Sequence, residues 1–452
     1  MSPSSRGWLL ALAGWTTLAG RPSLAQHDHH HHESPPAAEA PAPAIPDEAV
    51  TLAELEARAV EARPLLAAAA ARLEAARSEA RQAGRLANPA LGLKAEELPL
   101  ESGPSRGKVG LVWSQQLPLA GQLSRSRSWL EAEAGTSEGR LILARAGVQA
   151  EVRRAFYRAV SGQRALVQAQ QVLALAREAV EVTAQLFNTG AADRPDQLAI
   201  EVDAERAELA VAEAEQHLAA RRAELATAVG DTALAARPLA DTFEDLAPDP
   251  IEESWRSGAL AAAPELELER RAVVAAAQRV ALEKARLGPE LGLTAGVLDN
   301  RERADGGSRL GGEFFGEALF TLPLWNRNQD GVVAARAELA AAEALERDAR
   351  LALAARLDAI WNRYRQARAA VEAYRERILP RAEEAHQLYL ERYHQMAAAY
   401  PQVLLAERRL GELREAYRVA LEHYWLARVD LDFPGSAGAS SSMGELQEGQ
   451  RP

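Results

Sequence analysis

The residue types best suited to chemistry gather in one short segment near the start of the chain. Five histidines and two carboxylates stand side by side there, as His27, Asp28, His29, His30, His31, His32 and Glu33. Imidazole nitrogens and carboxylate oxygens are ligands for Zn²⁺, Cu²⁺, Ni²⁺ and Co²⁺, and imidazole loses this capacity when it is protonated. The pattern predicts an open, flexible metal-binding segment at His27, His29, His30, His31 and His32. The alternatives are a polar linker or an affinity tag, and Asp28 within the run argues against the tag.

The rest of the sequence offers no catalytic pattern. The chain has no cysteine, so it has no thiol nucleophile, no disulfide and no lipidated N-terminal Cys. It also lacks HExxH and a glycine-rich phosphate loop at a strand–helix junction. Four further histidines stand singly on predicted helices and are expected to be surface or interhelical residues: His217, His386, His394 and His423. We therefore predict no enzyme and no cofactor. A periplasmic hydrolase built on the histidine segment is a minor alternative, because that segment lacks rigid elements.

Composition and the first residues indicate an exported helical protein. Hydrophobic residues make up 48% of the chain but aromatic residues only 5%, a balance that alanine-rich packed helices use. The formal net charge of −12 argues against nucleic acid as a partner. Residues 1–25 have a basic start, a short apolar run and a small-residue cleavage site, which predicts a signal peptide. No later segment reaches about 20 consecutive apolar residues, so a membrane span would have to be made of strands.

An internal repeat of about 200 residues organises the mature chain. Four landmarks recur in the same order: 63–66 with 263–266, 88–93 with 288–293, 117–119 with 322–324, and Phe187 and Pro195 with Tyr393 and Pro401. Each half is predicted to contain a first helix, a strand hairpin, a very long helix, a turn and a return helix. The domains follow: signal peptide 1–25, disordered His/Pro-rich arm 26–48, repeat 49–230, linker 231–253, repeat 254–432 and disordered tail 433–452.

The strand hairpins are the candidate membrane-spanning elements. They are predicted at 89–100 and 109–119 in the first half and at 289–299 and 310–322 in the second, long enough for tilted strands in a bilayer. Four strands cannot close, and open sheet edges in lipid would leave backbone groups unpaired. Three copies give twelve strands, and two copies would give eight, the smallest common number. Five aromatic residues are candidates for interfacial girdles, or for ordinary strand residues: Trp113, Phe314, Phe315, Phe320 and Trp325.

From about residue 51 to 431 the sequence resembles the TolC-type outer-membrane efflux proteins. The resemblance rests on the repeat, the Asn88-Pro89 and Gly288-Pro289 strand openings, the two Leu-Pro-Leu turns and the hairpin tips 187–190 and 393–396. It implies a mainly α protein with a small β part: a trimer, a shared twelve-stranded transmembrane barrel and a periplasmic tunnel of long helical hairpins. In the family the tips read aromatic-x-x-Gly. Gly190 keeps that pattern and Met396 departs from it, so the pattern does not predict how the second tip turns or how it docks.

The resemblance also implies partners and surfaces. A membrane-fusion adaptor in the periplasm, coupled to an inner-membrane RND pump, would meet the tips at Asn188, Thr189, Gly190, Ala191, Tyr393, His394, Met396 and Ala397. Acids near the tips could line the periplasmic mouth and favour cations: Asp193, Asp196, Glu201, Asp203 and Glu407. Outward solubilising charge is the alternative for each of them.

The Leu117-Pro118-Leu119-x-Gly121 turn and the histidines most resemble the cobalt-zinc-cadmium (CzcC-type) branch, which implies divalent heavy-metal cations as cargo. Drugs or small organic compounds are the alternative cargo. A soluble periplasmic coiled-coil adaptor is the alternative protein class, and the duplicated hairpins argue against it.

Overall fold

The computed structural model describes residues 49–97, 107–190, 192–232, 237–303, 308–397 and 400–435. All of them lie in one compact unit, Ile45–Pro452. The expected signal peptide, the histidine segment, Ala191 and nearly all of the expected tail lie outside the described residues.

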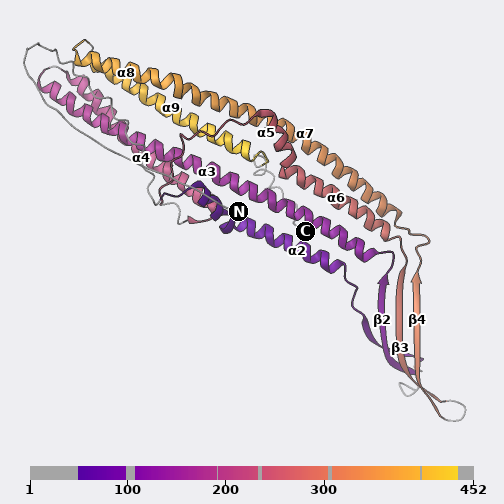
Figure 1. Ribbon diagram of the computed structural model, residues 1–452. Coiled ribbons are helices and arrows are strands. Elements are labelled where there is room, and N and C mark those ends of the chain that lie inside the picture. The colour runs from indigo at the N-terminus through magenta and orange to yellow at the C-terminus, as the bar shows by residue number, and fades with distance from the viewer. Residues whose placement is uncertain are drawn as a thin grey trace, which may run out of the picture. The chain divides into compact units, whose positions relative to one another are not determined.

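The described chain consists of two successive sets of helices and strands with the same order (Figure 1). The first set is α1 (Leu52–Ala62), α2 (Pro64–Ala83), β1 (Ala90–Glu96), β2 (Lys108–Pro118), α3 (Gln122–Asn188) and α4 (Arg194–Val229). The second set is α5 (Glu252–Ala262), α6 (Pro264–Ala285), β3 (Glu290–Arg303), β4 (Arg309–Thr321), α7 (Gln329–Ala373), the π-helix η3 (Tyr374–Ile378), α8 (Leu379–His394) and α9 (Tyr400–Asp432). The predicted fold class, long helices with a small sheet in a two-part repeat, is confirmed.

Prolines fix where the first helices of each half divide. Pro64 and Pro264 are the first residues of α2 and α6, where the missing N–H costs nothing. The residues before them, Arg63 and Ala263, are extended, with ψ of 115° and 117°. This is the conformation that a following proline imposes. Each predicted first helix is therefore two helices that meet at a proline.

The second long helix differs from the very long, continuous helix that the sequence predicts for each half. It is interrupted by the π-helical turn η3, where the Leu379 N–H donates to the Tyr374 carbonyl, five residues back. The next residue, Pro380, has no N–H and its ring would collide with the carbonyl four residues earlier in a regular α-helix. The wider π turn accommodates that ring. The first long helix, α3, has no proline and runs unbroken for 67 residues.

The four strands form one antiparallel sheet in the order β1-β2-β3-β4. The central pair, β2 and β3, joins the two repeats, with Trp113 opposite Ala295. The third strand continues to Arg303, four residues beyond the predicted end at 299, and pairs there with Arg309 across a register shift. Figure 1 shows β2, β3 and β4 side by side at one end of the long helices. Among the described residues β1 and β4 each pair on one side only, so both edges of the sheet are open there.

The helices pack beside one another around α3. On one flank α3 contacts α2 and α4, and on the other it contacts α6 and α9. The far flank of α6 and α9 contacts α7, and α8 packs on α9. Alanine and glycine permit these close approaches; a Cβ at Gly139, for example, would lie 3.2 Å from Leu268 Cδ1. The two halves are thus joined along α3 as well as through the sheet.

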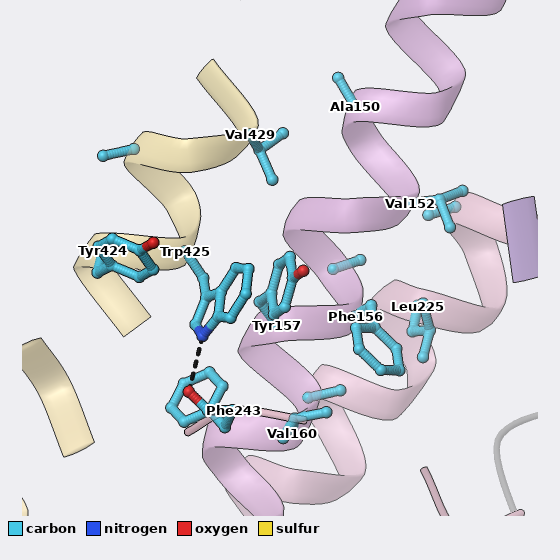
Figure 2. Packing of buried hydrophobic residues seen from close by; sticks show 14 of the residues in the cluster. Ala150, Val152, Phe156, Tyr157, Val160, Leu225, Phe243, Tyr424, Trp425 and Val429 are labelled. Atoms are coloured by element: carbon cyan, nitrogen blue, oxygen red, sulfur yellow. Dashed lines mark hydrogen bonds between the residues drawn. The ribbon is translucent and has the colours of Figure 1, made fainter. Parts of the chain in front are cut away.

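The segment between the halves, residues 237–251, covers one side of this helical layer, which we call the linker face. Phe243 is fully buried, and the Trp425 indole Nε1–H donates to its carbonyl oxygen at 2.9 Å (Figure 2). Trp425 stacks on Tyr157 with ring centroids 4.5 Å apart. Arg164 of α3 pairs with Asp241 at 2.6 Å. The opposite side of α3, α7 and α9, which no described segment covers in this way, we call the bare face.

Candidate functional site

The two faces of the sheet differ in chemistry. The strand registers place one set of alternate residues on a common face, and that set is almost wholly apolar: Leu91, Leu93, Ala95, Val109, Leu111, Trp113, Leu117, Leu291, Leu293, Ala295, Val297, Phe314, Ala318 and Phe320. This apolar face is exposed in the single chain, with Leu93 83% and Phe314 77% exposed. An exposed apolar surface of this extent indicates contact with lipid or another apolar partner.

The polar face of the sheet carries most of the charged strand residues; Asp299, opposite Val109, lies on the other face. Lys108 lies 3.4 Å from Glu313, and the Asn300 amide donates to Glu313 at 2.5 Å. Lys94 sits over the Phe315 ring, 4.7 Å from its centroid. Of the five aromatics expected at membrane interfaces, Trp113, Phe314 and Phe320 lie on the apolar face. Phe315 instead faces the polar side, because it neighbours Phe314 in a strand and strand side chains alternate.

The first helix-hairpin tip closes α3 with a glycine. The Gly190 N–H donates to the Phe187 carbonyl at 3.0 Å, and Gly190 adopts the left-handed conformation with φ +74°. Asn188 is the last residue of α3 and Thr189 its C-cap. The Thr189 hydroxyl donates to the Leu186 carbonyl at 2.9 Å. Glycine tolerates a left-handed φ without steric cost, which is why it ends helices.

The second tip makes the same kind of turn without a glycine. Met396 has φ +55°, and the Ala397 N–H donates to the Arg392 carbonyl at 2.8 Å, which is the closing bond of a Schellman motif. The departure from Gly at this position therefore changes the strain of the turn and not its form. The Met396 side chain is 96% exposed, so this tip presents a long apolar side chain to its surroundings. Tyr393 and His394 end α8 beside it, with ring centroids 6.0 Å apart.

The five acids expected near the periplasmic mouth do not form one cluster. Asp193 caps α4 by accepting from the Asp196 N–H at 3.1 Å, so these two carboxyl groups stand at a helix N-terminus. Glu201 accepts from Gln197 on its own helix at 3.0 Å. Asp203 of α4 forms an ion pair with Arg408 of α9, which ties the two return helices together.

Glu407 has a different setting from the other four acids. It lines a groove between α3, α8 and α9, together with Glu383, Glu384 and His386. Among the described residues, no group of three or more His, Asp or Glu side chains is placed to hold a metal ion. The expected metal ligands at 27–32 lie outside the described part of the chain.

A basic groove on the bare face was not predicted from the sequence. It lies between α3, α7 and α9 and has a volume of about 560 Å³. Arg154, Arg158, Arg363, His423 and Asp430 line it. Its only signal in the sequence was a set of arginines four residues apart on α3, and ordinary solvated helices have the same spacing. Joining them to Arg363 and His423 requires the packing of three helices.

Comparison with known proteins agrees with these features. The family model of outer membrane efflux proteins matches residues 55–231 and 255–432, which are the two repeats. No curated protein sequence matches the chain. Within the described residues, no helix is both long and apolar enough to cross a membrane.

Several solved structures share the fold. The outer membrane protein VceC from Vibrio cholerae is 20% identical, with a TM-score of 0.68 over 85% of this chain and 96% of that one. The MtrE outer membrane channel of Neisseria gonorrhoeae, in its open state, is 21% identical, with a TM-score of 0.65 over 85% and 89%. The Campylobacter jejuni CmeC outer membrane channel is 16% identical, with a TM-score of 0.64 over 87% and 88%. The chain belongs to the outer membrane efflux protein family, and it is a bacterial outer-membrane channel with a periplasmic helical part, a transporter rather than an enzyme.

Proposed function

We propose that three copies of this chain form the exit duct of a tripartite RND-type efflux pump. Channels of this family are trimers that work with periplasmic adaptors and inner-membrane pumps. The observation that carries the proposal is the four-stranded sheet with two open edges, one apolar face and one polar face. Pairing β4 of one copy with β1 of the next would close twelve strands, place the apolar face against lipid and leave the polar face around an aqueous lumen.

The helical tips are the proposed contact with the adaptor. A 67-residue helix rises about 100 Å, so the end of α3 lies far from the sheet that precedes it. Asn188, Thr189 and Gly190 end one hairpin, and Tyr393 to Ala397 end the other, where the exposed Met396 side chain supports a partly apolar contact. The acids near these tips remain candidates for the periplasmic mouth. Among them, the carboxylates of Asp196 and Glu407 have no capping bond or ion pair that the structure specifies.

Two classes of cargo are proposed, each with its own support. Divalent heavy-metal cations are favoured by the histidines at 27–32 and by the resemblance to the CzcC-type branch. Small organic compounds are favoured by the basic groove with an alanine-rich floor on the bare face. Neither class needs a reaction in the channel, because the proposed inner-membrane partner supplies the energy.

Susceptibility of a deletion strain tests the cargo. The strain lacking the gene is compared with strains that carry the full chain or the chain without residues 27–32, on zinc, cobalt, cadmium, copper, detergents and organic acids. Selective metal sensitivity supports cation export, and failure of the shortened chain to complement assigns a role to the histidines. Sensitivity to organic compounds with normal metal tolerance retains the channel and rejects the metal cargo. Normal growth on every compound rejects the efflux role.

A further inference from the structure

The basic groove lies on the side of the helical layer that faces away from the linker. On α3, Arg158 and Val160 are two residues apart and so point about 160° apart around the helix. Val160 packs in the core with Phe243 of the linker (Figure 2), and Arg158 lines the groove. On α9, His423 and Trp425 have the same separation, with Trp425 bonded to the linker and His423 exposed in the groove. The linker and the groove therefore lie on opposite sides of the helical layer.

If the bare face formed the outside of the proposed trimer, three copies of the linker would project into the duct. The arrangement with an open duct is therefore the one in which the bare face lines the lumen. The groove is then repeated three times around the passage. This step rests on the proposed trimeric duct.

The groove has an excess of positive charge. Arg154 and Arg363 both pair with one carboxylate, Asp430, each at 2.8 Å. Arg158 has no ion-pair or hydrogen-bond partner among the described residues, although its side chain is half-buried. Three arginines and one carboxylate line the groove, in a chain whose formal net charge is −12. A planar guanidinium in this setting favours a carboxylate, sulfonate or phosphate group.

The floor of the groove is apolar. Small and aliphatic side chains line it between the charged groups: Ala367, Ala370, Ala416, Val419, Ala420, Leu426 and Ala427. A ligand that fits both parts has a compact apolar body and one anionic group, and a volume of about 560 Å³ is within the range of small-molecule sites. A bare metal cation fits neither part, because it would meet uncompensated guanidinium charge.

A second hollow beside Arg158 does not neutralise it. This hollow, between α3, α4 and α9, contains Glu415 and Glu422, and Arg418 already pairs with both, at 2.5 Å and 3.5 Å. Its remaining acid, Glu213, makes no ion pair with Arg158. Arg158 therefore stands between the two hollows with its charge available to a ligand.

We propose that the groove between α3, α7 and α9 is a binding site for amphipathic organic anions in the channel wall, with Arg158 as the group that contacts the anion. The site gives the duct a preference among cargo molecules, because an anion with an apolar body is retained there and a cation is repelled. It also adds three positive centres to the lumen of the proposed trimer, at the level of the linker.

Block of single-channel current tests the site. The purified protein is placed in planar lipid bilayers, and naphthalene-1-sulfonate is compared with 1-naphthylmethylammonium, which has a similar body and the opposite charge. We expect the sulfonate to block the wild-type channel and the ammonium to block it at least about tenfold more weakly. Arg158→Gln should weaken block by the sulfonate about tenfold, the loss expected for one charge-assisted hydrogen bond, and Arg158→Lys should restore part of it.

Arg145→Gln is the matched control, because it removes the same charge from the same helix about 140° away around its axis. Equal block by the two probes, no effect of Arg158→Gln, or an equal effect of Arg145→Gln would each overturn the site. Arg363→Gln, at an exposed side chain, provides a second groove variant if the Arg158 variant does not fold.

Equilibrium dialysis of the protein in lipid nanodiscs against naphthalene-1-sulfonate separates the two proposals. Binding that Arg158→Gln weakens, without any conductance, would retain the site and reject the duct. Conductance without such binding would retain the duct and reject the site.

Discussion

Met396 occupies a backbone conformation that usually belongs to glycine. A residue with a Cβ in the left-handed region is disfavoured by about 1 kcal/mol. Gly190 makes the equivalent turn at the other tip without that cost. Since the strained residue is also 96% exposed, the packing of the chain does not explain why methionine stands there. The proposed contact with an adaptor does, because it would bury the apolar side chain.

Replacing Met396 with glycine should separate the effect of the backbone strain from the effect of the side chain's contact with the proposed adaptor. We expect Met396→Gly to stabilise the turn by about 1 kcal/mol and to slow hydrogen exchange of the Ala397 amide, which closes the turn. The same variant should weaken binding of the purified adaptor, because it removes the exposed side chain. Gly190→Ala is the converse control and should speed exchange at the first tip. Unchanged exchange at Ala397 would show that the turn stores no strain.

Glu283 is a buried carboxylate that joins α6 to the start of α7. Its side chain is 5% exposed and lies 2.9 Å from both Arg279 and Arg286. The Asn328 amide, at the N-cap of α7, donates to it at 2.8 Å. Burial by itself raises the pKa of the Glu283 carboxyl, but the Asn328 hydrogen bond and the two arginine charges outweigh it and hold the pKa below its ordinary value of 4.5.

This lowered pKa predicts a pH dependence of stability. A carboxyl group with a depressed folded-state pKa stabilises the protein above its unfolded-state pKa and loses that contribution as the pH falls through the folded-state pKa. As the pH falls from the unfolded-state pKa through the folded-state pKa, the thermal unfolding temperature of the wild type should therefore fall more steeply than that of Glu283→Gln. The two should differ most near neutral pH. Parallel curves over the acid range would contradict the assignment.

At the scale of elements, one proline explains why the two long helices differ. Both repeats predict a helix of similar length, yet α3 is continuous and the second is divided by η3 before Pro380. In the π turn the Leu379 N–H donates a hydrogen bond to the Tyr374 carbonyl, and the wider turn leaves room for the proline ring. Tyr374 also contacts Tyr417 of α9, with ring centroids 6.4 Å apart, so the irregular turn is packed against the return helix.

Pro380→Ala tests this explanation. The new N–H can donate to the carbonyl four residues back, so we expect a regular α-helix and a gain in stability of about 1 kcal/mol, measured as a higher unfolding temperature. Pro264→Ala is the control, because Pro264 is the first residue of α6, where proline is tolerated, and its replacement should have little effect. A loss of stability in Pro380→Ala would show that the π turn has its own favourable packing.

At the scale of the whole molecule, the sheet determines where the protein can reside. One of its faces is mostly apolar and the other carries most of the charged residues, and among the described residues both of its edges are unpaired. The long helices at one end of the sheet carry most of the ion pairs and contain the buried hydrophobic core. The described residues therefore combine one lipid-compatible sheet surface with a long hydrated part, which agrees with the outer-membrane placement of the family.

Two arginine substitutions on the same strand should show which sheet face meets lipid. Val297 and Thr294 both lie on the central strand β3, on the apolar and the polar face respectively. Val297→Arg should destabilise insertion by about 2–4 kcal/mol if it lies near the bilayer midplane, and Thr294→Arg should be tolerated. The measurement is the fraction of protein that refolds into lipid vesicles as a heat-modifiable oligomer. Equal loss in both variants would reject the assignment of the faces.

The sequence alone determined the repeated order of helices and strands in this protein. Landmarks such as Pro64 and Pro264 act on their own backbone, and alternation in a strand or periodicity in a helix acts over a few residues. Such local causes predicted the strands and the first long helix. They did not predict the η3 break in the second long helix, because the choice between an α turn and a π turn at Pro380 depends on packing geometry that local patterns do not specify.

Only the tertiary structure decided which residues share a surface. The groove joins Arg158 of α3, Arg363 of α7 and His423 of α9, which are up to 265 positions apart in the sequence. Their meeting depends on how each helix is rotated when the linker packs Phe243 against Trp425. The sequence also showed that Met396 replaces the glycine expected at the second tip. Only the structure showed that the tip keeps the left-handed turn with methionine. Rotation and packing are collective properties of the chain, so no single segment of the sequence contains them.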